Sequence, residues 1–458
     1  MPVTGKLLRD QWDAVALASA VLLVLSFVFG GASQNHALRL ALVELASLPL
    51  LVLAASRIVQ TGQWREHRLA LGLGAALLAI PLIQLIPLPP AIWTRLPGRD
   101  QMVLALELAG LQPGWASLSL TPDNTWRSAL ALMPPVAFFL AVLSMSHIQR
   151  ERMVKIVIAA AVVGIVLGAA QLVSGGDKLY VWHWTDAGSV NGFFANRNHL
   201  ASSLLATLPF AVIFGAAALR RRGQRSSALW LGALFAGLVV VALAAIRSRA
   251  GITLFVPVMG VSALAAWIAA GRGRPKPGLL LLLGSLGAAL TVVAVLALPP
   301  ILARFDTQGA PEGRFDRWPL VAETAQTYLP LGTGMGSFDA VYRSVEPLQE
   351  LDSTFFNQAH NDYLETWLEA GWLGVGVIVA FFVWFFRRCL SAWKAPVSRE
   401  GDLQRAASIA IGVLLLHSIA DYPLRTTTLA VIFALCCGLL ELAGRPGQVR
   451  RASARPST

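Results

Sequence analysis

Apolar segments long enough to cross a lipid bilayer recur along almost the whole chain, and they limit the folds that it can adopt. With 56% hydrophobic and only 14% charged residues, the composition is that of a polytopic helical membrane protein. The sequence therefore predicts an all-α fold with about 12 transmembrane helices. We expect the spans near residues 14–33, 37–56, 69–88, 128–146, 154–174, 199–219, 228–246, 250–270, 278–301, 371–387, 404–420 and 426–443.

The connections between these segments differ in charge. Basic clusters at residues 57–68, 150–155, 220–225, 272–276 and 387–399 alternate with connections that are poorer in Lys and Arg for their length. The positive-inside rule predicts that these clusters and both termini are cytoplasmic. Because the same clusters account for much of the formal net charge of +12, nucleic acid is not an expected partner.

The spans and connections divide the chain into five predicted parts. The longest connection, residues 302–370, lies on the outer face, and aromatic residues such as Trp318, Phe338 and Tyr342 can pack within it. There we expect a short helix over Asp316–Tyr328 and a tight glycine turn over Pro330–Gly336. The five parts are N-terminal transmembrane helices (1–190), transmembrane helices that carry two polar turns (191–301), the large outer loop (302–370), C-terminal transmembrane helices (371–443) and a basic cytoplasmic tail (444–458).

A polar stretch, Gln358–Glu365, closes the outer loop before an apolar helix that we expect to begin near Gly371. Histidine can take up a proton near neutral pH, which few side chains do. A lone histidine is commonly structural. The position of His360 beside Asn361, at the membrane surface and on the same face as several arginines, favours a role as catalytic base.

Two pairs of titratable residues lie four positions apart near this face. Glu365 and Glu369 would share one helical face and could orient a substrate or fix an arginine. His417 and Asp421 lie near the outer end of the span predicted at 404–420. We interpret His417 and Asp421 mainly as a structural pair, with a role in the site as the alternative.

Arg247 and Arg249 lie in the turn between the seventh and eighth predicted spans, where the charge rule predicts few cations. An arginine at a membrane boundary needs an anionic partner or water. The guanidinium fork suits phosphate, so this turn is a candidate phosphate-binding site, and Arg249 is the stronger candidate. The alternative is contact with lipid headgroups or with acidic residues of the outer loop.

Three more arginines lie on the same predicted face. Arg197 stands between Asn196 and Asn198, whose amides can hydrogen-bond to backbone or to a sugar. The alternative there is an ordinary helix start with Asn198 as the N-cap. Arg314 and Arg317 could add positive charge to the site, or could pair with acidic residues of their own loop.

Several other catalytic patterns are missing from the sequence. The glycine turn is not followed by Lys-Ser/Thr and does not follow a predicted strand, which excludes a Walker A motif. No His, Cys or carboxylate cluster has the spacing of a metal site, and no Ser-His-Asp order stands out. The three cysteines are too few for a disulfide framework. We therefore expect neither a metal ion nor another cofactor.

Taken in order, several short motifs resemble those of the bacterial O-antigen ligase and O-antigen polymerase superfamily. They cover roughly residues 190–385, and the ordered set is more specific than any single motif, whereas the first half of the chain matches only in hydropathy. The motifs are an Asn-rich turn before a helix (192–201), a Ser-Arg turn (248–251), Gly-Arg followed by Trp (313–318), Pro-Leu-Gly-x-Gly-x-Gly-x-Phe (330–338), His-Asn-x-x-Leu (360–364) and Glu-x-Gly-x-x-Gly (369–374).

The resemblance implies a GT-C-like, metal-independent inverting glycosyltransferase, multi-pass in the bacterial inner membrane, with its active site at the periplasmic face. Such enzymes move a glycan from an undecaprenyl diphosphate carrier to a sugar hydroxyl of an acceptor. The roles implied by analogy are His360 as the base that activates the acceptor, Arg249 and Arg314 as diphosphate ligands, Arg197, Arg247 and Arg317 as assisting cations, and Asn361, Asn196 and Asn198 as supporting residues.

The motifs leave more than one function open. A ligase (acceptor lipid A core) and a polymerase (acceptor another repeat unit) share them, and related enzymes that glycosylate proteins tend to carry an added C-terminal domain. A transporter for a lipid-linked sugar would instead bury charges in mid-span and break its helices at the bilayer midplane. The predicted spans are nearly free of charge and the polar groups gather on one face, which favours surface chemistry.

Overall fold

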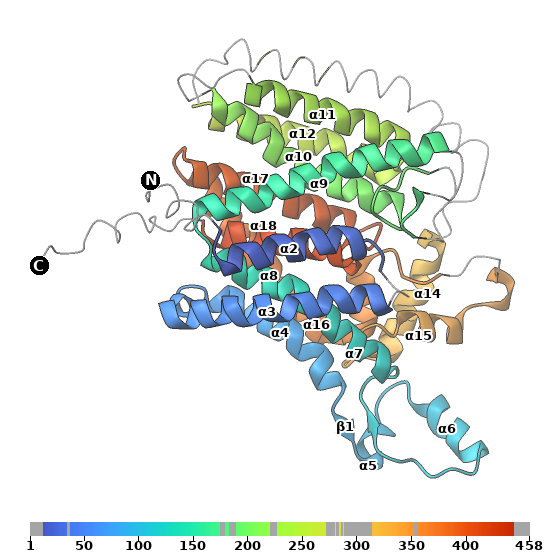
Figure 1. Cartoon of the computed structure of the whole chain (residues 1–458). Helices are drawn as coiled ribbons and strands as arrows, with labels where there is room; N and C mark the ends of the chain where they lie inside the picture. The colour runs from blue at the N-terminus through green and yellow to red at the C-terminus, as the bar shows by residue number, and fades with distance from the viewer. Residues whose placement is uncertain are drawn as a thin grey trace, which may run out of the picture.

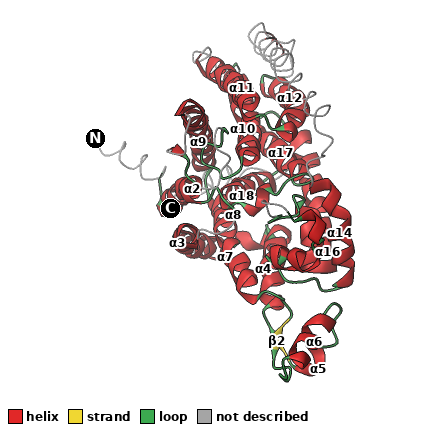
Figure 2. Cartoon of the chain, turned by 90° about the vertical axis from the view of Figure 1, so that its right-hand side faces the viewer, coloured by secondary structure: helices red, strands yellow, loops and turns green. Residues whose placement is uncertain are grey.

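The computed structural model describes residues 12–33, 37–174, 179–182, 189–219, 227–271, 314–351 and 356–443, together with the isolated residues 280, 284 and 287. This part of the chain is almost entirely helical (Figures 1 and 2), which confirms the predicted all-α class. Among the predicted features, the ninth span (278–301) apart from those isolated residues, the basic clusters at 220–225 and 272–276, and the tail (444–458) lie outside the described residues.

The structure contains helices of very different lengths, with one short pair of strands. The α-helices are α2 (Ala14–Phe29), α3 (Ala37–Thr61), α4 (Arg68–Gln84), α5 (Pro90–Trp93), α6 (Asp100–Leu108), α7 (Pro122–Ala131), α8 (Met133–Ser144), α9 (His147–Ser174), α10 (Arg197–Ala218), α11 (Ser227–Ile246), α12 (Arg249–Ala269), α14 (Arg314–Thr327), α15 (Phe338–Val345), α16 (Asp362–Lys394), α17 (Arg399–His417) and α18 (Thr427–Glu441). The 3-10 helices are η1 (Gln63–Arg65), η3 (Leu348–Glu350) and η4 (Pro423–Arg425), and the antiparallel strands are β1 (Pro87–Leu88) and β2 (Ala116–Ser117).

Seven helical segments of the described chain are long and apolar enough to cross a bilayer, which makes this a helical membrane protein. They are α3, the continuous pair α7–α8, α9, α10, α11, α12 and α16, while α2, α4 and α18 are shorter apolar helices. Figure 1 shows these helices running nearly parallel, with α14 and α15 at one end of the bundle. We call this end the site end. The count of about 12 spans stays a prediction.

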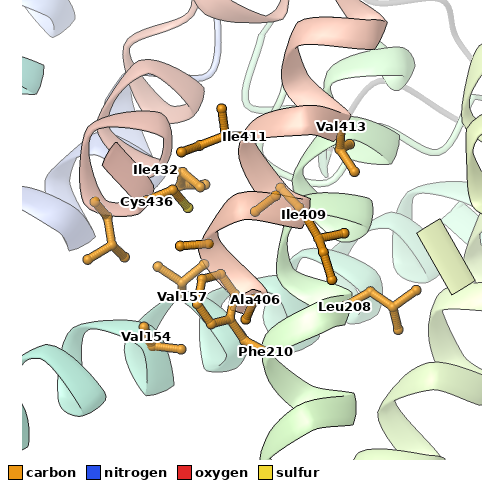
Figure 3. Packing of buried hydrophobic residues seen from close by; sticks show 14 of the residues in the cluster. Val154, Val157, Leu208, Phe210, Ala406, Ile409, Ile411, Val413, Ile432 and Cys436 are labelled. Carbon is orange, nitrogen blue, oxygen red and sulfur yellow. The ribbon is translucent and has the colours of Figure 1, made fainter. Parts of the chain in front are cut away.

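Helix α10 is the central helix of the bundle. Of its candidate span 89% is buried, because α9, α11, α12 and α17 pack around it. Figure 3 shows Leu208 and Phe210 of α10 in the same core as Val157 of α9 and Ile409 of α17. Small residues let the neighbouring helix α11 approach: a Cβ on Gly232 would lie 2.8 Å from the carbonyl oxygen of Ala211. The first turn of α10 is therefore held firmly at the site end.

Helix α16 begins earlier than the sequence suggested. We expected its start near Gly371, but it begins at Asp362, and Gly371 instead lies at a kink inside it with φ 55° and ψ −146°. The predicted start was wrong because it was placed where the apolar run begins. The first turns of α16 are polar, and protein rather than lipid buries them. At the kink, the Trp372 backbone N–H donates to the carbonyl oxygen of Pro330 (3.0 Å). The kink is where the glycine turn of the outer loop meets the helix.

The outer loop packs onto the bundle through its backbone. The predicted short helix is confirmed as α14, and the glycine turn follows it. The side-chain amide of Gln84, at the end of α4, bridges α16 and the glycine turn. Its Nε2 donates to the carbonyl oxygen of Glu369 in α16 (2.8 Å), and its Oε1 accepts from Met335 N–H in the turn (2.9 Å). Leu120 N–H also donates to the carbonyl oxygen of Thr333 (2.9 Å). These contacts hold the glycine turn tightly against the end of the bundle.

Replacing Gly371 with alanine tests the kink. The backbone conformation there is one that L-residues rarely adopt, and a Cβ would collide with the carbonyl oxygen of Pro330. We expect Gly371→Ala to lower the free energy of unfolding by roughly 1–3 kcal/mol. The measurement is thermal unfolding in detergent, with Gly376→Ala as the matched control, because Gly376 lies in the same helix and faces open space. Equal melting temperatures for the two variants would contradict the proposed role of the kink.

Candidate active site

The carboxylate of Asp421 is the centre of a polar cluster at the site end. It lies in the turn between α17 and η4 and is buried. Its Oδ1 is 3.4 Å from Nδ1 of His360 and 3.8 Å from Nε2 of His199, and Oδ2 accepts a hydrogen bond from Asn198 Nδ2 (2.7 Å). The Tyr422 backbone N–H donates to Oδ1 (2.9 Å). Three segments that are distant in sequence therefore meet at one carboxylate.

Asp421 is held in its charged form. Burial raises the pKa of its carboxyl, but the imidazoles of His199 and His360 lower the pKa by a larger amount, so that it lies well below its ordinary value. A carboxylate that stays ionised at neutral pH can orient an imidazole and stabilise the positive charge that the imidazole gains with a proton. Asp421 is thus equipped to support His360.

The backbone around His360 fixes where its ring points. His360 has φ 50°, a left-handed conformation that is uncommon for a residue with a side chain. The neighbouring Ala359 holds this conformation through both its backbone groups: its N–H donates to Glu365 Oε2 (2.8 Å), and its carbonyl oxygen accepts from Trp318 Nε1 (2.8 Å). Asn361 then caps α16 by accepting from the backbone N–H groups of residues 363 and 364.

The His360 ring is neither buried nor free in solvent. Its side chain is 21% exposed, while that of Asp421 is 1% exposed. Phe356 stacks on the ring with centroids 5.7 Å apart, and Tyr422 meets it edge-on at 4.7 Å. One ring nitrogen therefore lies near the carboxylate while part of the ring reaches the surface, which is the arrangement that a general base requires.

Two of the predicted arginines come to this cluster from α14. Arg314 donates through one of its terminal guanidinium nitrogens to the carbonyl oxygen of Ala420 (2.8 Å), the residue before Asp421. One turn later, the Arg317 guanidinium lies 5.0 Å from the centroid of Phe356, the ring that stacks on His360. Of the acidic partners considered for them in their own loop (Asp306, Glu312 and Asp316), the first two lie outside the described residues.

The other three arginines stand at helix ends of the same region. Arg197 and Arg249 are the first residues of α10 and α12, and Arg247 is an exposed residue with φ 55° just before α12. The first turns of α10 and α12 touch, because a Cβ on Gly251 would lie 2.9 Å from Cβ of Ala201. The structure thus places Arg197 and Arg249 on adjacent helix starts.

The two asparagines beside Arg197 have separate roles. The N-cap of α10 is Asn196, whose side chain accepts from Asn198 N–H (2.8 Å), so the interpretation of Asn198 as N-cap is wrong. This leaves the Asn198 side chain to bind Asp421. Spacing alone could not separate the two, since either asparagine can cap a helix that starts one or two residues later.

A second buried cluster, around Arg425, links η4 to the first turns of α16. Arg425 lies 2.9 Å from Glu369 Oε2, 3.4 Å from Glu365 Oε1 and 3.6 Å from Asp362 Oδ1. Glu369 Oε1 also accepts from the N–H of Gly336 in the glycine turn (2.9 Å). Of the two roles considered for Glu365 and Glu369, the structure shows the second, in which they fix an arginine.

Several of these residues were missed in the sequence. Arg425, Tyr422 and His199 received no role, and Asp421 was interpreted mainly as a partner of His417. His417 Nδ1 instead lies 2.6 Å from Oγ of Ser202. A usable signal was the short polar turn 421–425, which carries an acid, a tyrosine and an arginine between two apolar helices. Within the described residues, no group of three His, Cys, Asp or Glu is arranged to hold a metal ion.

Comparison with known protein families shows which family part of this chain resembles. A family model described as O-antigen ligase matches residues 199–379, from the first turn of α10 to the middle of α16. Residues 199–379 are therefore similar to the O-antigen ligase family. No curated protein matches the chain significantly. Of the predicted site residues, the matched segment contains His360, Asn361 and the arginines from 247 to 317, whereas residues 196–198 precede it. Asp421 and Arg425, which were not among the predicted site residues, lie beyond its end.

The cluster around Arg425 gives a test of the structure of this site. Replacing Arg425 with glutamine would leave three carboxylates without their shared cation, and we expect a loss of roughly 3–5 kcal/mol of stability. The control is Arg343→Gln, which breaks an exposed pair with Asp339 and should cost about 0.5 kcal/mol or less. Thermal unfolding of the two variants in one detergent makes the comparison, and similar melting temperatures would contradict it.

Proposed function

We propose that this protein is a metal-independent glycosyltransferase that moves a glycan from undecaprenyl diphosphate to a sugar hydroxyl of lipid A core. The observation that carries the proposal is the partly exposed His360 ring against the buried, ionised Asp421, with Arg314 and Arg317 on the same cluster. A base beside several cations suits a reaction in which a hydroxyl attacks and an anion leaves. Similarity of residues 199–379 to the O-antigen ligase family supports the substrate class.

His360 acts as the general base. Asp421 lies nearest Nδ1, so that a proton on this nitrogen is stabilised and Nε2 is left to accept the proton of the acceptor hydroxyl. The 3.4 Å separation is longer than a good hydrogen bond, and such contacts commonly tighten only when substrate binds. Asn361 supports this geometry by fixing the start of α16 directly after His360.

The arginines bind the diphosphate of the donor. Arg249 and Arg314 are the main ligands and Arg197, Arg247 and Arg317 assist, with Asn196 and Asn198 shaping the start of α10. The positive ends of the α10 and α12 dipoles point to the same region, and helix N-termini favour anions. The guanidinium groups stabilise the charge that develops on the leaving diphosphate, which is the work that a metal ion does in other phosphate chemistry.

The chemical step is a direct displacement. The acceptor oxygen forms a bond to the anomeric carbon while the bond from that carbon to the diphosphate oxygen breaks. The diphosphate leaves with the electron pair, and the hydroxyl proton passes to His360. Attack from the face opposite the leaving group inverts the anomeric centre.

The membrane arrangement follows from the charge pattern and the fold. We propose a GT-C-like bundle of about 12 spans in the bacterial inner membrane, with both termini cytoplasmic and the site end periplasmic. In this arrangement residues 302–370 form the periplasmic loop domain between the helices of 191–301 and 371–443. The apolar helices beside the site accept the polyprenyl tail of the donor.

The deciding experiment is a transfer assay with purified protein, polyprenyl-diphosphate glycan and lipid A core, in the presence of EDTA. We expect glycan on lipid A from the wild type. His360→Ala should lower the rate by roughly 10²- to 10⁴-fold, because the base is lost, and Arg249→Ala should lower it as well. Lengthened lipid-linked glycans instead of glycosylated lipid A would identify a polymerase. Unchanged rates in both variants would refute the proposed site, and an inactive wild type would favour a transporter.

Asp421→Asn tests the support of the base separately. The amide keeps the shape of the side chain but removes the charge that stabilises protonated His360, so we expect kcat to fall by about 100-fold or more. KM for the donor should change little, since Asp421 is not a diphosphate ligand. Asp339→Asn, on the surface of α15, is the control. If kcat of Asp421→Asn equals that of the control, Asp421 does not support the base.

A further inference from the structure

Residues 86–117 form a small projection between α4 and α7. The strands β1 and β2 pair at its base, with Pro87 opposite Ser117. Inside it, Trp93 Nε1 donates to the carbonyl oxygen of Gly114 (2.8 Å), and the buried Arg99 guanidinium donates to the carbonyl oxygen of Leu118. Figures 1 and 2 both show α5 and α6 to the side of the helix bundle, and Figure 1 shows them at the level of α14 and α15. The projection is therefore a built structure that extends sideways at the site end.

The outer surface of this projection is apolar. Helix α6 has no buried residue, although only Asp100, Gln101 and Glu107 of its nine residues are polar. Leu108 is 81% exposed and Trp115 is 70% exposed. Apolar surface of this extent is costly in water and marks a site of contact. The large exposed apolar residues are Ile86, Ile92, Met102, Leu104, Leu108, Leu111 and Trp115.

The neighbouring structure indicates what covers this surface. Leu82 and Ile83, in the last turn of the apolar helix α4, are also exposed and lead directly into Ile86 at the base of the projection. The apolar surface of the projection is thus continuous with the side of the bundle that faces lipid. A partner helix would bury one stripe of α6, whereas α6 is apolar around most of its circumference. Exposed tryptophan is typical of the boundary between lipid and water.

We propose that α6 and its flanking residues lie in the headgroup layer of the bilayer leaflet at the site end, beside α4. The partner is the phospholipid leaflet itself. The projection also contacts the outer loop, since Tyr328 packs against Gly98. Just after the projection, Leu120 N–H donates to the carbonyl oxygen of Thr333 in the glycine turn. Lipid contact at α6 therefore sets the height of the glycine turn and α14 relative to the membrane. This inference is independent of the reaction proposed above.

A fluorescent probe at Leu108 tests the inference in proteoliposomes of phosphatidylcholine and phosphatidylglycerol. Leu108→Cys is labelled with an environment-sensitive fluorophore in a background with alanine at 389, 436 and 437. Ser344→Cys, on the exposed surface of α15, is the matched control. We expect blue-shifted emission at residue 108 and strong quenching by phospholipids that are spin-labelled near the headgroup, with neither effect at residue 344.

A second measurement keeps the native cysteines. Benzoylphenylalanine at position 108 should crosslink on illumination to a clickable phospholipid in the same vesicles. Emission and quenching at residue 108 that match those at residue 344 would overturn the inference, because the surface would then face water. Crosslinking of two chains in place of lipid would overturn it as well, because the surface would then be an interface between copies.

Discussion

A buried carboxylate needs compensation, and the way Asp421 obtains it organises the site end of this protein. Asn198 from the start of α10, His360 from the end of the outer loop and His199 all face this one side chain. Arg314 of α14 binds the backbone of the residue before it. Because an uncompensated buried charge is strongly destabilising, these segments have to meet here when the chain folds. The same requirement brings the predicted base to a carboxylate that can support it.

The sequence predicts the helical membrane class well because lipid leaves the backbone few alternatives. A span must satisfy its own backbone hydrogen bonds, so an apolar run of sufficient length predicts a helix with little other information. The start of α16 is different: its first turns carry Asp362, Glu365 and Glu369 and are covered by the outer loop. Hydropathy describes contact with lipid only, and it gave the wrong start for a helix whose first part is buried in protein.

The candidate site likewise contains residues that the sequence predicts and residues that it does not. His360 and the arginines were predicted because polar residues at a membrane boundary violate the expected charge pattern. Asp421, His199 and Arg425 were not assigned their partners, since those contacts join residues 56 to 223 positions apart and no local pattern encodes them. The glycine turn shows a further difference. Its glycines approach α16 and Glu369 closely, so this motif positions the outer loop against the helix.

A site that joins two membrane-bound molecules has to lie at the depth where their reacting groups meet. The diphosphate of a polyprenyl carrier lies at the headgroup layer, because its tail is in the hydrocarbon and its charges are in water. Helix α10 fixes the lateral position of the site through its burial in the bundle. Depth requires a different contact, because parallel helices can slide along the membrane normal at modest cost. In the arrangement proposed above, the apolar surface around α6 supplies this second constraint, and Leu120, just after the projection, connects it to the glycine turn by donating to the carbonyl oxygen of Thr333.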